Sequence, residues 1–163
     1  MARLHEIGWQ IRRRRVDLGM TQDLLGRASG LSRATIVELE SGAIEDLSFN
    51  RTSRVLSVLG LGLETSAGSK RSPASALRIA AQTASVSFRT KLDPALLQTA
   101  LTEGHAPPQA IAHIGTLLDE APSSLLARLV AEVSRKAGVA PATIWGNMNK
   151  LATGFMSPRD LWQ

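Results

Sequence analysis

Cysteine is absent from the 163-residue sequence, and so is any long apolar run. Without cysteine the chain can form neither a disulfide nor a thiolate metal site, a usage typical of a reducing compartment. No uninterrupted apolar stretch reaches the roughly 18 residues that a membrane span needs. The first residues carry no apolar run of signal-peptide length. We therefore expect a cytoplasmic protein that does not enter a membrane.

The sequence also lacks the residue groupings of enzymes. The three histidines, His5, His105 and His113, do not stand with acidic residues at metal-ligand spacing. Asp119 and Glu120 are adjacent and point in different directions on a helix, which makes them a poor carboxylate pair. No glycine-rich phosphate-binding loop is present. We expect no catalytic residue, no metal and no cofactor.

The positive charge is unevenly distributed. The net charge is +5, and a basic balance permits a nucleic-acid partner. Residues 1–63 hold nine Lys or Arg against seven acids, residues 64–91 hold five against one, and residues 92–163 hold five against six. The excess therefore ends before residue 92, which predicts different partners for the two ends of the chain.

Apolar periodicity and helix caps predict helices throughout and no strand. In the first part, helices are expected at about 4–18, 21–30, 32–42 and 48–59, the last three capped by Thr21, Ser32 and Ser48. Residues 64–75 have a linker composition. Further helices are expected near 74–84 and from the prolines at 94, 107–108, 122 and 141. Trp145 and Trp162 are expected in a packed core, and the short tail is expected to add one turn that docks Trp162.

The expected fold is therefore all-α. A first helical domain is predicted over 1–63, a basic linker over 64–75, and a helical dimerisation or partner-binding domain over 76–163. A core of about 60–90 residues is marginal by itself, so we expect a homodimer.

The segment from Thr21 to Gly42 carries the motif that points to function. Two short helices meet at a turn that contains glycine, and Gly26 inside the first of them suggests a close helix contact. The motif residues are Thr21, Gln22, Leu25, Gly26, Gly30, Ser32, Glu40 and Gly42. This segment resembles the helix-turn-helix of the Cro/repressor, or XRE, family. Gly26 and Ser29 depart from the family's commoner alanines.

The resemblance covers about residues 3–62 and implies a five-helix domain whose third helix enters the major groove of double-stranded DNA. Ser32 would cap that helix and belongs to the set of residues expected at the DNA. Arg33 would bond guanine, and Ala34 and Thr35 would touch a thymine methyl group. Thr35 could also bond a base edge or a phosphate. Glu38 would accept from cytosine or merely repel phosphate. Gln22 resembles the family's phosphate clamp.

Arg12 to Arg15 form a run of four on the first helix, and consecutive residues point around a helix. We expect one or two of them to contact phosphate, naming Arg13 and Arg14, and the others to be solvated or paired. Glu40 is expected in a structural ion pair.

Two functions fit this layout. The first is an antitoxin that represses its own operon and neutralises a cognate protein toxin through its C-terminal domain. The alternative is a stand-alone transcriptional regulator, similar to a phage repressor, whose C-terminal domain dimerises or senses a ligand. A helix-turn-helix that serves protein contacts alone is a further reading.

Overall fold

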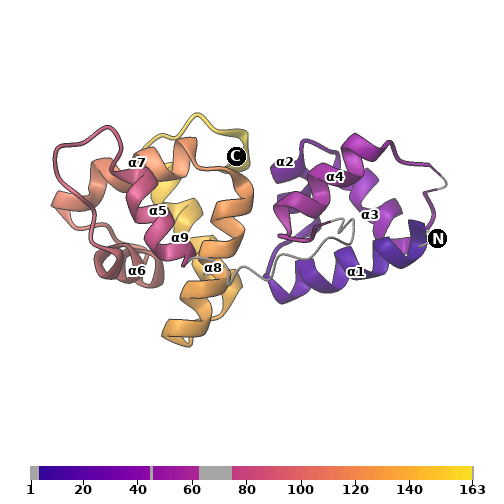
Figure 1. Cartoon of the computed structure of the whole chain (residues 1–163), viewed down its shortest axis with the longest axis horizontal. Helices are drawn as coiled ribbons and strands as arrows, with labels where there is room; N and C mark the ends of the chain where they lie inside the picture. Colours follow the sequence, from indigo (N-terminus) through magenta and orange to yellow (C-terminus); the bar gives the residue numbers. More distant parts are fainter. Residues whose placement is uncertain (1–3, 45, 63–74, 163) are drawn as a thin grey trace. The chain divides into compact units, whose positions relative to one another are not determined.

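The computed structural model describes residues 4–44, 46–62 and 75–162, and within these ranges the chain is helical with no strand. The all-α prediction is therefore confirmed. The chain divides into two compact units, Met1–Ser69 and Lys70–Gln163, which are described separately below. Figure 1 labels the helices of each unit and colours them by their position along the sequence. The predicted basic linker falls almost wholly in residues 63–74, outside the described residues.

Unit 1 contains α1 (Leu4–Asp17), α2 (Gln22–Ser29), α3 (Arg33–Ser41) and α4 (Phe49–Val58). Helix α3 packs against both α1 and α2, and α2 also packs against α4. Their shared core is built from apolar side chains of all four helices: Ile11, Leu18, Leu25, Ile36, Leu39, Val55 and Leu59. This arrangement leaves α3 supported from one side only.

Local signals set the ends of α2 and α3. The Thr21 side chain accepts a hydrogen bond from the backbone N–H of Leu24, so it caps α2 as predicted. Gly30 ends α2 with φ of 68°, a left-handed conformation that glycine adopts without steric cost. Gly42 ends α3 in the same way with φ of 75°.

Two expectations for unit 1 are corrected. Ser48 stands at the N-terminus of α4, but its side chain makes no capping hydrogen bond; its carbonyl instead accepts from the backbone of Thr52. The family resemblance implied five helices. The described residues of unit 1 hold four, and the next helix along the chain packs in unit 2.

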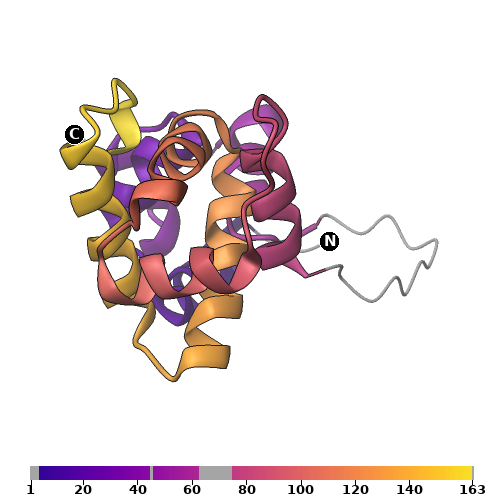
Figure 2. The same ribbon diagram turned by 90° about the vertical axis from the view of Figure 1, so that its left-hand side faces the viewer.

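Unit 2 contains α5 (Ala76–Ala84), α6 (Pro94–Glu103), α7 (Ile111–Glu120), α8 (Ser123–Ala137) and α9 (Pro141–Gly154). Short 3-10 turns lie at Pro108–Ala110 and Asp160–Trp162. Helices α5 and α9 each pack against α6, α7 and α8, so the five helices surround one core (Figure 2).

The two C-terminal tryptophans belong to that core, as predicted. Trp145 and Trp162 are buried with their ring centroids 6.4 Å apart. The indole N–H of Trp162 donates to the carbonyl of Leu118 at 3.0 Å, so its polar atom is satisfied despite burial. The last turn of the chain is therefore docked by Trp162.

A carboxylate of α8 holds the start of α5. Glu132 accepts hydrogen bonds from the Ser75 hydroxyl (2.7 Å) and the Leu77 backbone N–H (3.1 Å), and pairs with Lys136 at 2.8 Å. Burial raises the pKa of Glu132, but the bonds from Lys136, Ser75 and Leu77 outweigh it and lower the pKa from 4.5 to about 2. Helix α5 is thereby attached to unit 2 by a charged contact as well as by packing.

Candidate nucleic-acid interface

Helix α3 has one face in the core and one face in solvent. Ile36, Leu39 and Glu40 are buried. The opposite face carries the exposed side chains of Arg33, Ala34, Val37, Glu38 and Ser41. Helical spacing places these five residues along one side of α3 over its whole length. Such a helix can enter a groove without unfolding anything else.

The N-terminus of α3 is closed by a serine cap. The Ser32 hydroxyl accepts from the Thr35 backbone N–H at 3.1 Å, and the two hydroxyl oxygens of Ser32 and Thr35 lie 2.9 Å apart. The capping role predicted for Ser32 is therefore confirmed. The Thr35 hydroxyl keeps hydrogen-bonding capacity beside its contact with Ser32, so both the hydroxyl and the methyl group of Thr35 are available to an outside partner.

Two glycines allow the helices to approach closely. A Cβ added at Gly26 would lie 2.8 Å from the Leu31 carbonyl oxygen, so only glycine fits between α2 and the turn into α3. This confirms the close contact predicted there. A Cβ at Gly8 would collide with the Leu39 carbonyl oxygen, so α1 touches the α3 backbone directly. The sequence reasoning missed Gly8, whose signal was a glycine in mid-helix.

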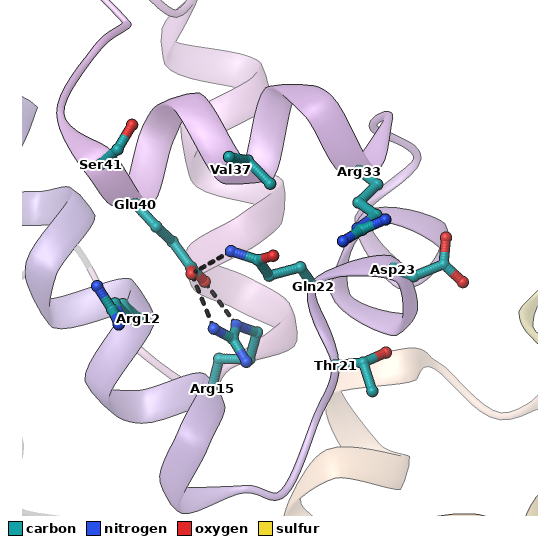
Figure 3. A pocket seen from close by; sticks show the side chains of 9 residues that line it. All are labelled: Arg12, Arg15, Thr21, Gln22, Asp23, Arg33, Val37, Glu40 and Ser41. Atoms are coloured by element: carbon teal, nitrogen blue, oxygen red, sulfur yellow. Dashed lines mark hydrogen bonds and ion pairs between the residues drawn. The ribbon is translucent and has the colours of Figure 1, made fainter.

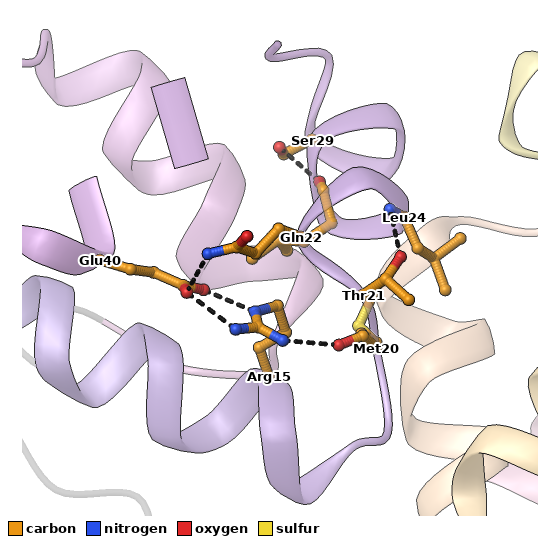
Figure 4. A network of polar contacts seen from close by, with 8 residues as sticks. Arg15, Met20, Thr21, Gln22, Leu24, Ser29 and Glu40 are labelled. Carbon is orange, nitrogen blue, oxygen red and sulfur yellow. Dashed lines mark hydrogen bonds and ion pairs between the residues drawn. The ribbon is translucent and has the colours of Figure 1, made fainter. Parts of the chain in front are cut away.

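An ion pair and an amide connect the three helices (Figure 4). Arg15 of α1 donates from Nε to Glu40 Oε1 at 2.6 Å and from a terminal nitrogen to Oε2 at 2.8 Å. A second terminal nitrogen donates to the Met20 carbonyl at 2.8 Å. Gln22 of α2 donates from Nε2 to Glu40 Oε2 at 3.0 Å. The structural ion pair expected of Glu40 is confirmed.

Gln22 therefore has a role that the sequence reasoning did not foresee. Its amide nitrogen carries two hydrogens, and one of them is committed to Glu40. The second hydrogen and the N-terminal N–H groups of α2 remain suited to a phosphate. Glu40 thus holds Gln22 in position at the start of α2.

The four consecutive arginines have different surroundings. Arg12 and Arg15 lie four and seven residues after Gly8, on the α1 face that meets α3. Arg13 lies over the ring of the exposed Trp9 at 5.6 Å, a cation–π contact. Half-buried Arg14 donates from Nε to the Leu59 carbonyl at 3.2 Å, which ties α1 to the end of α4. The DNA contacts expected of Arg13 and Arg14 remain predictions.

A hollow of about 700 Å³ brings the polar residues together (Figure 3). Its lining comes from α1, α2 and α3 and from the residue before α2: Arg12, Arg15, Thr21, Gln22, Asp23, Arg33, Val37, Glu40 and Ser41. Arg12 and Arg33, both exposed, lie on opposite sides of the Arg15–Glu40–Gln22 cluster. Val37 and Ser41 were not named from the sequence, and Arg12 was expected to be solvated or paired rather than to line this hollow.

Among the described residues no group of His, Asp and Glu could hold a metal ion. No helix in the described part of the chain is long and apolar enough to cross a bilayer.

Comparison with known proteins gives one match. Residues 11–65 match the family model described as helix-turn-helix, of the XRE type. No curated protein and no solved structure gives a significant match to the chain. The match includes all of α2, α3 and α4 and the second half of α1. The geometry and this match together identify residues 11–65 as an XRE-type helix-turn-helix, the domain of a DNA-binding transcription regulator.

Proposed function

We propose that the chain recognises a specific double-stranded DNA operator by inserting the exposed face of α3 into the major groove, and that it represses transcription there. The observation that carries this is the one-sided support of α3, which leaves Arg33, Ala34, Val37, Glu38 and Ser41 exposed. A major groove about 12 Å wide admits one helix. The N-terminal residues of that helix reach the base edges.

Separate groups carry sequence reading and backbone binding in this proposal. Arg33 forms bidentate bonds to guanine, and the methyl groups of Ala34 and Thr35 contact thymine. Glu38 accepts from cytosine N4. Gln22 and Arg12, across the hollow from Arg33, bind phosphate and set the register. Arg13 is a further phosphate contact, whereas Arg14 would first have to leave the Leu59 carbonyl.

The experiment is selection of bound sequences from a random double-stranded library by the full chain. A single recovered motif supports the proposal. Recovery of unrelated sequences, or no retention of DNA, overturns it and leaves a helix-turn-helix that serves protein contacts. A two-fold symmetric motif is expected, because we also propose a homodimer that places two α3 helices about one DNA turn apart. Light scattering that shows a monomer bound as one copy per operator would refute the homodimer.

The role of unit 2 is proposed in two forms. In the first, the chain is an antitoxin, unit 2 binds a cognate toxin, and the complex represses its own operon. Its support is the layout of a short repressor domain followed by a near-neutral, apolar unit. Large aromatic side chains are common anchors of such interfaces, but Trp145 and Trp162 are buried in the core of unit 2, so another surface would have to bind the toxin. Native co-purification of one small toxic protein encoded beside this gene would support this form.

In the second form, the chain is a stand-alone regulator and unit 2 senses a ligand. A specific observation favours it, which is a cavity in unit 2 with a cationic rim. Purification of the native chain without a protein partner, together with an operator affinity that responds to a small molecule, would support this form. A stoichiometric toxin partner would refute it.

A further inference from the structure

Unit 2 contains a cavity of about 580 Å³ that plays no part in the helix-turn-helix. It lies between the outer face of α5 and residues 85–94, which lead from α5 to α6. Its volume is within the range of about 300–1,000 Å³ found for small-molecule sites. The cavity is therefore large enough for an organic ligand.

The wall formed by residues 85–92 is fixed in place by contacts with its neighbours. The Ser85 hydroxyl donates to the Ala81 carbonyl at 2.7 Å and accepts from the Leu92 backbone N–H at 2.8 Å. The buried ring of His113 on α7 has its Nε2 3.0 Å from the Thr90 carbonyl oxygen. These bonds hold both ends of the wall, so the cavity exists before a ligand arrives, which lowers the entropic cost of binding.

The lining of the cavity includes apolar side chains. Phe88 lines it and stacks on His113 with the ring centroids 4.2 Å apart, which fixes the orientation of the phenyl ring. Val86 lines it too and is 82% exposed. Leu92 lines the cavity as well. An apolar body that covers Val86 and Phe88 would remove their surface from water.

The cavity also carries cations. Arg78, Arg89 and Lys91 line it and are exposed, and none of them makes an ion pair within the described residues. Among the described residues of the lining, Asp93 is the one acid, and its Oδ1 accepts from the Ala95 backbone N–H as the cap of α6. Residues 70–91 hold five Lys or Arg and no acid, whereas residues 92–163 hold five against six, so the positive excess of unit 2 comes from the segment that includes Arg78, Arg89 and Lys91.

We infer that this cavity binds a small organic anion that has an apolar, preferably aromatic, body and one acidic group. The body lies on Phe88 and Val86, and the acidic group lies among Arg78, Arg89 and Lys91. This inference rests on the ligand-sensing form of the proposed function for its regulatory meaning, while the binding itself can be measured without DNA. Contact of the three cations with DNA phosphate is the competing explanation. A concave, apolar-lined cavity suits a small body better than a duplex backbone.

The test uses two probes with the same aromatic body. One is the anion 8-anilinonaphthalene-1-sulfonate, and the other is neutral N-phenyl-1-naphthylamine, titrated by fluorescence into the full chain. One saturable site per chain is expected. The anion should bind about tenfold more tightly than the neutral probe, since a bond to a charged group contributes roughly 1.5–3 kcal/mol and 1.4 kcal/mol is tenfold. Equal affinities, or no saturable site, overturn the inference.

Variants locate the site. R89Q/K91Q should remove the preference for the anion, and R135Q/K150Q, which changes two exposed cations of α8 and α9, should leave it within twofold. V86E places a carboxylate at the cavity and should weaken binding of the anionic probe. V86Q is the uncharged control for this substitution. Thermal unfolding of each variant checks that the fold is kept. A preference that survives R89Q/K91Q refutes the inference.

A DNA titration distinguishes the competing explanation. The affinity of R89Q/K91Q for DNA should equal that of the unchanged chain within twofold. Lower DNA affinity with unchanged probe binding would mean that the cations contact phosphate, and it would overturn the inference. Failure of the proposed function can be distinguished from failure of this inference. If the chain selects no operator but binds the anion through Arg89 and Lys91, the proposed function is refuted and the inference stands.

Discussion

Arg15 of α1 and Glu40 of α3 form a two-bond ion pair that is almost removed from water. The bonds measure 2.6 and 2.8 Å, and the side chains are 11% and 3% exposed. Removing one partner of such a pair strongly destabilises the fold, because the other charge is left buried without compensation. The pair also connects α3, the helix proposed to enter the major groove, to α1, which packs against it.

The first prediction concerns this pair. E40Q and R15Q should each lower the free energy of unfolding by about 3–5 kcal/mol, and the double variant should lose less than the sum. Urea unfolding measures all three. D23N is the control, because Asp23 and Arg27 pair at 3.1 Å with much greater exposure and contribute at most about 1 kcal/mol. Additive losses would show that Arg15 and Glu40 are not coupled.

The second prediction separates base reading from backbone binding. R33A should cost about 1–3 kcal/mol on the selected operator and relax the preference at one base pair. Q22A should weaken binding to all sequences alike, because Gln22 is assigned to phosphate. Gel-shift titrations on operator and random DNA measure both effects. Equal losses on the two DNAs for R33A would refute its assignment, and thermal unfolding of Q22A checks the loss of its bond to Glu40.

The third prediction concerns acid stability. The pKa of Glu132 is about 2 in the folded chain against an ordinary value of 4.5. A lowered folded pKa means that the stabilisation is complete above about pH 5 and is lost as the pH falls toward 2. The difference corresponds to at most about 3 kcal/mol. E132Q should therefore have a lower free energy of unfolding at pH 7 than the unchanged chain, and it should lose less of that free energy as the pH falls.

Tryptophan fluorescence follows this transition, since Trp145 and Trp162 lie in the same unit. E120Q, at an exposed position of α7, is the matched control and should keep the acid sensitivity of the unchanged chain. If E132Q and the unchanged chain lost stability equally between pH 5 and 2, the contact with α5 would not be the acid-sensitive element.

The fourth prediction divides DNA binding between the units. The positive excess of the sequence ends at Lys91, but a fragment that ended there would separate α5 from the rest of unit 2. Helix α5 packs on α8, and Glu132 accepts a hydrogen bond from its first turn. A fragment of residues 1–69 follows the observed division. It should keep the base preference of the full chain. The dependence of its DNA affinity on salt concentration (the salt slope), counted for each bound copy, should also equal that of the full chain. Its affinity should fall if unit 2 contributes to dimerisation.

The isolated fragment of residues 70–163 should not shift DNA. Its tryptophan fluorescence first establishes that it is folded, since Trp145 and Trp162 report on its core. A folded fragment that shifts DNA, or a 1–69 fragment with a markedly lower salt slope, would place phosphate contacts in unit 2.

The sequence by itself determined the local structure. Thr21 and Ser32 cap helices through hydroxyls that reach N–H groups three residues ahead, and Gly30 and Gly42 end them in a left-handed conformation. Such signals act within one helical turn, so they can be read without knowing what packs nearby. The helix-turn-helix was predicted for the same reason, because its motif is a sequence of short-range signals.

Tertiary structure decided where the long polar side chains point. Arg14 and Arg15 are neighbours in the sequence, yet the end of α4 and α3 give them different partners. Ser48 is a residue type that often caps helices, yet its side chain makes no capping hydrogen bond. The cationic cavity joins α5 to residues 85–94 only because α7 and α8 hold both in place. Contacts between residues tens of positions apart depend on the packed core, and no local pattern encodes them.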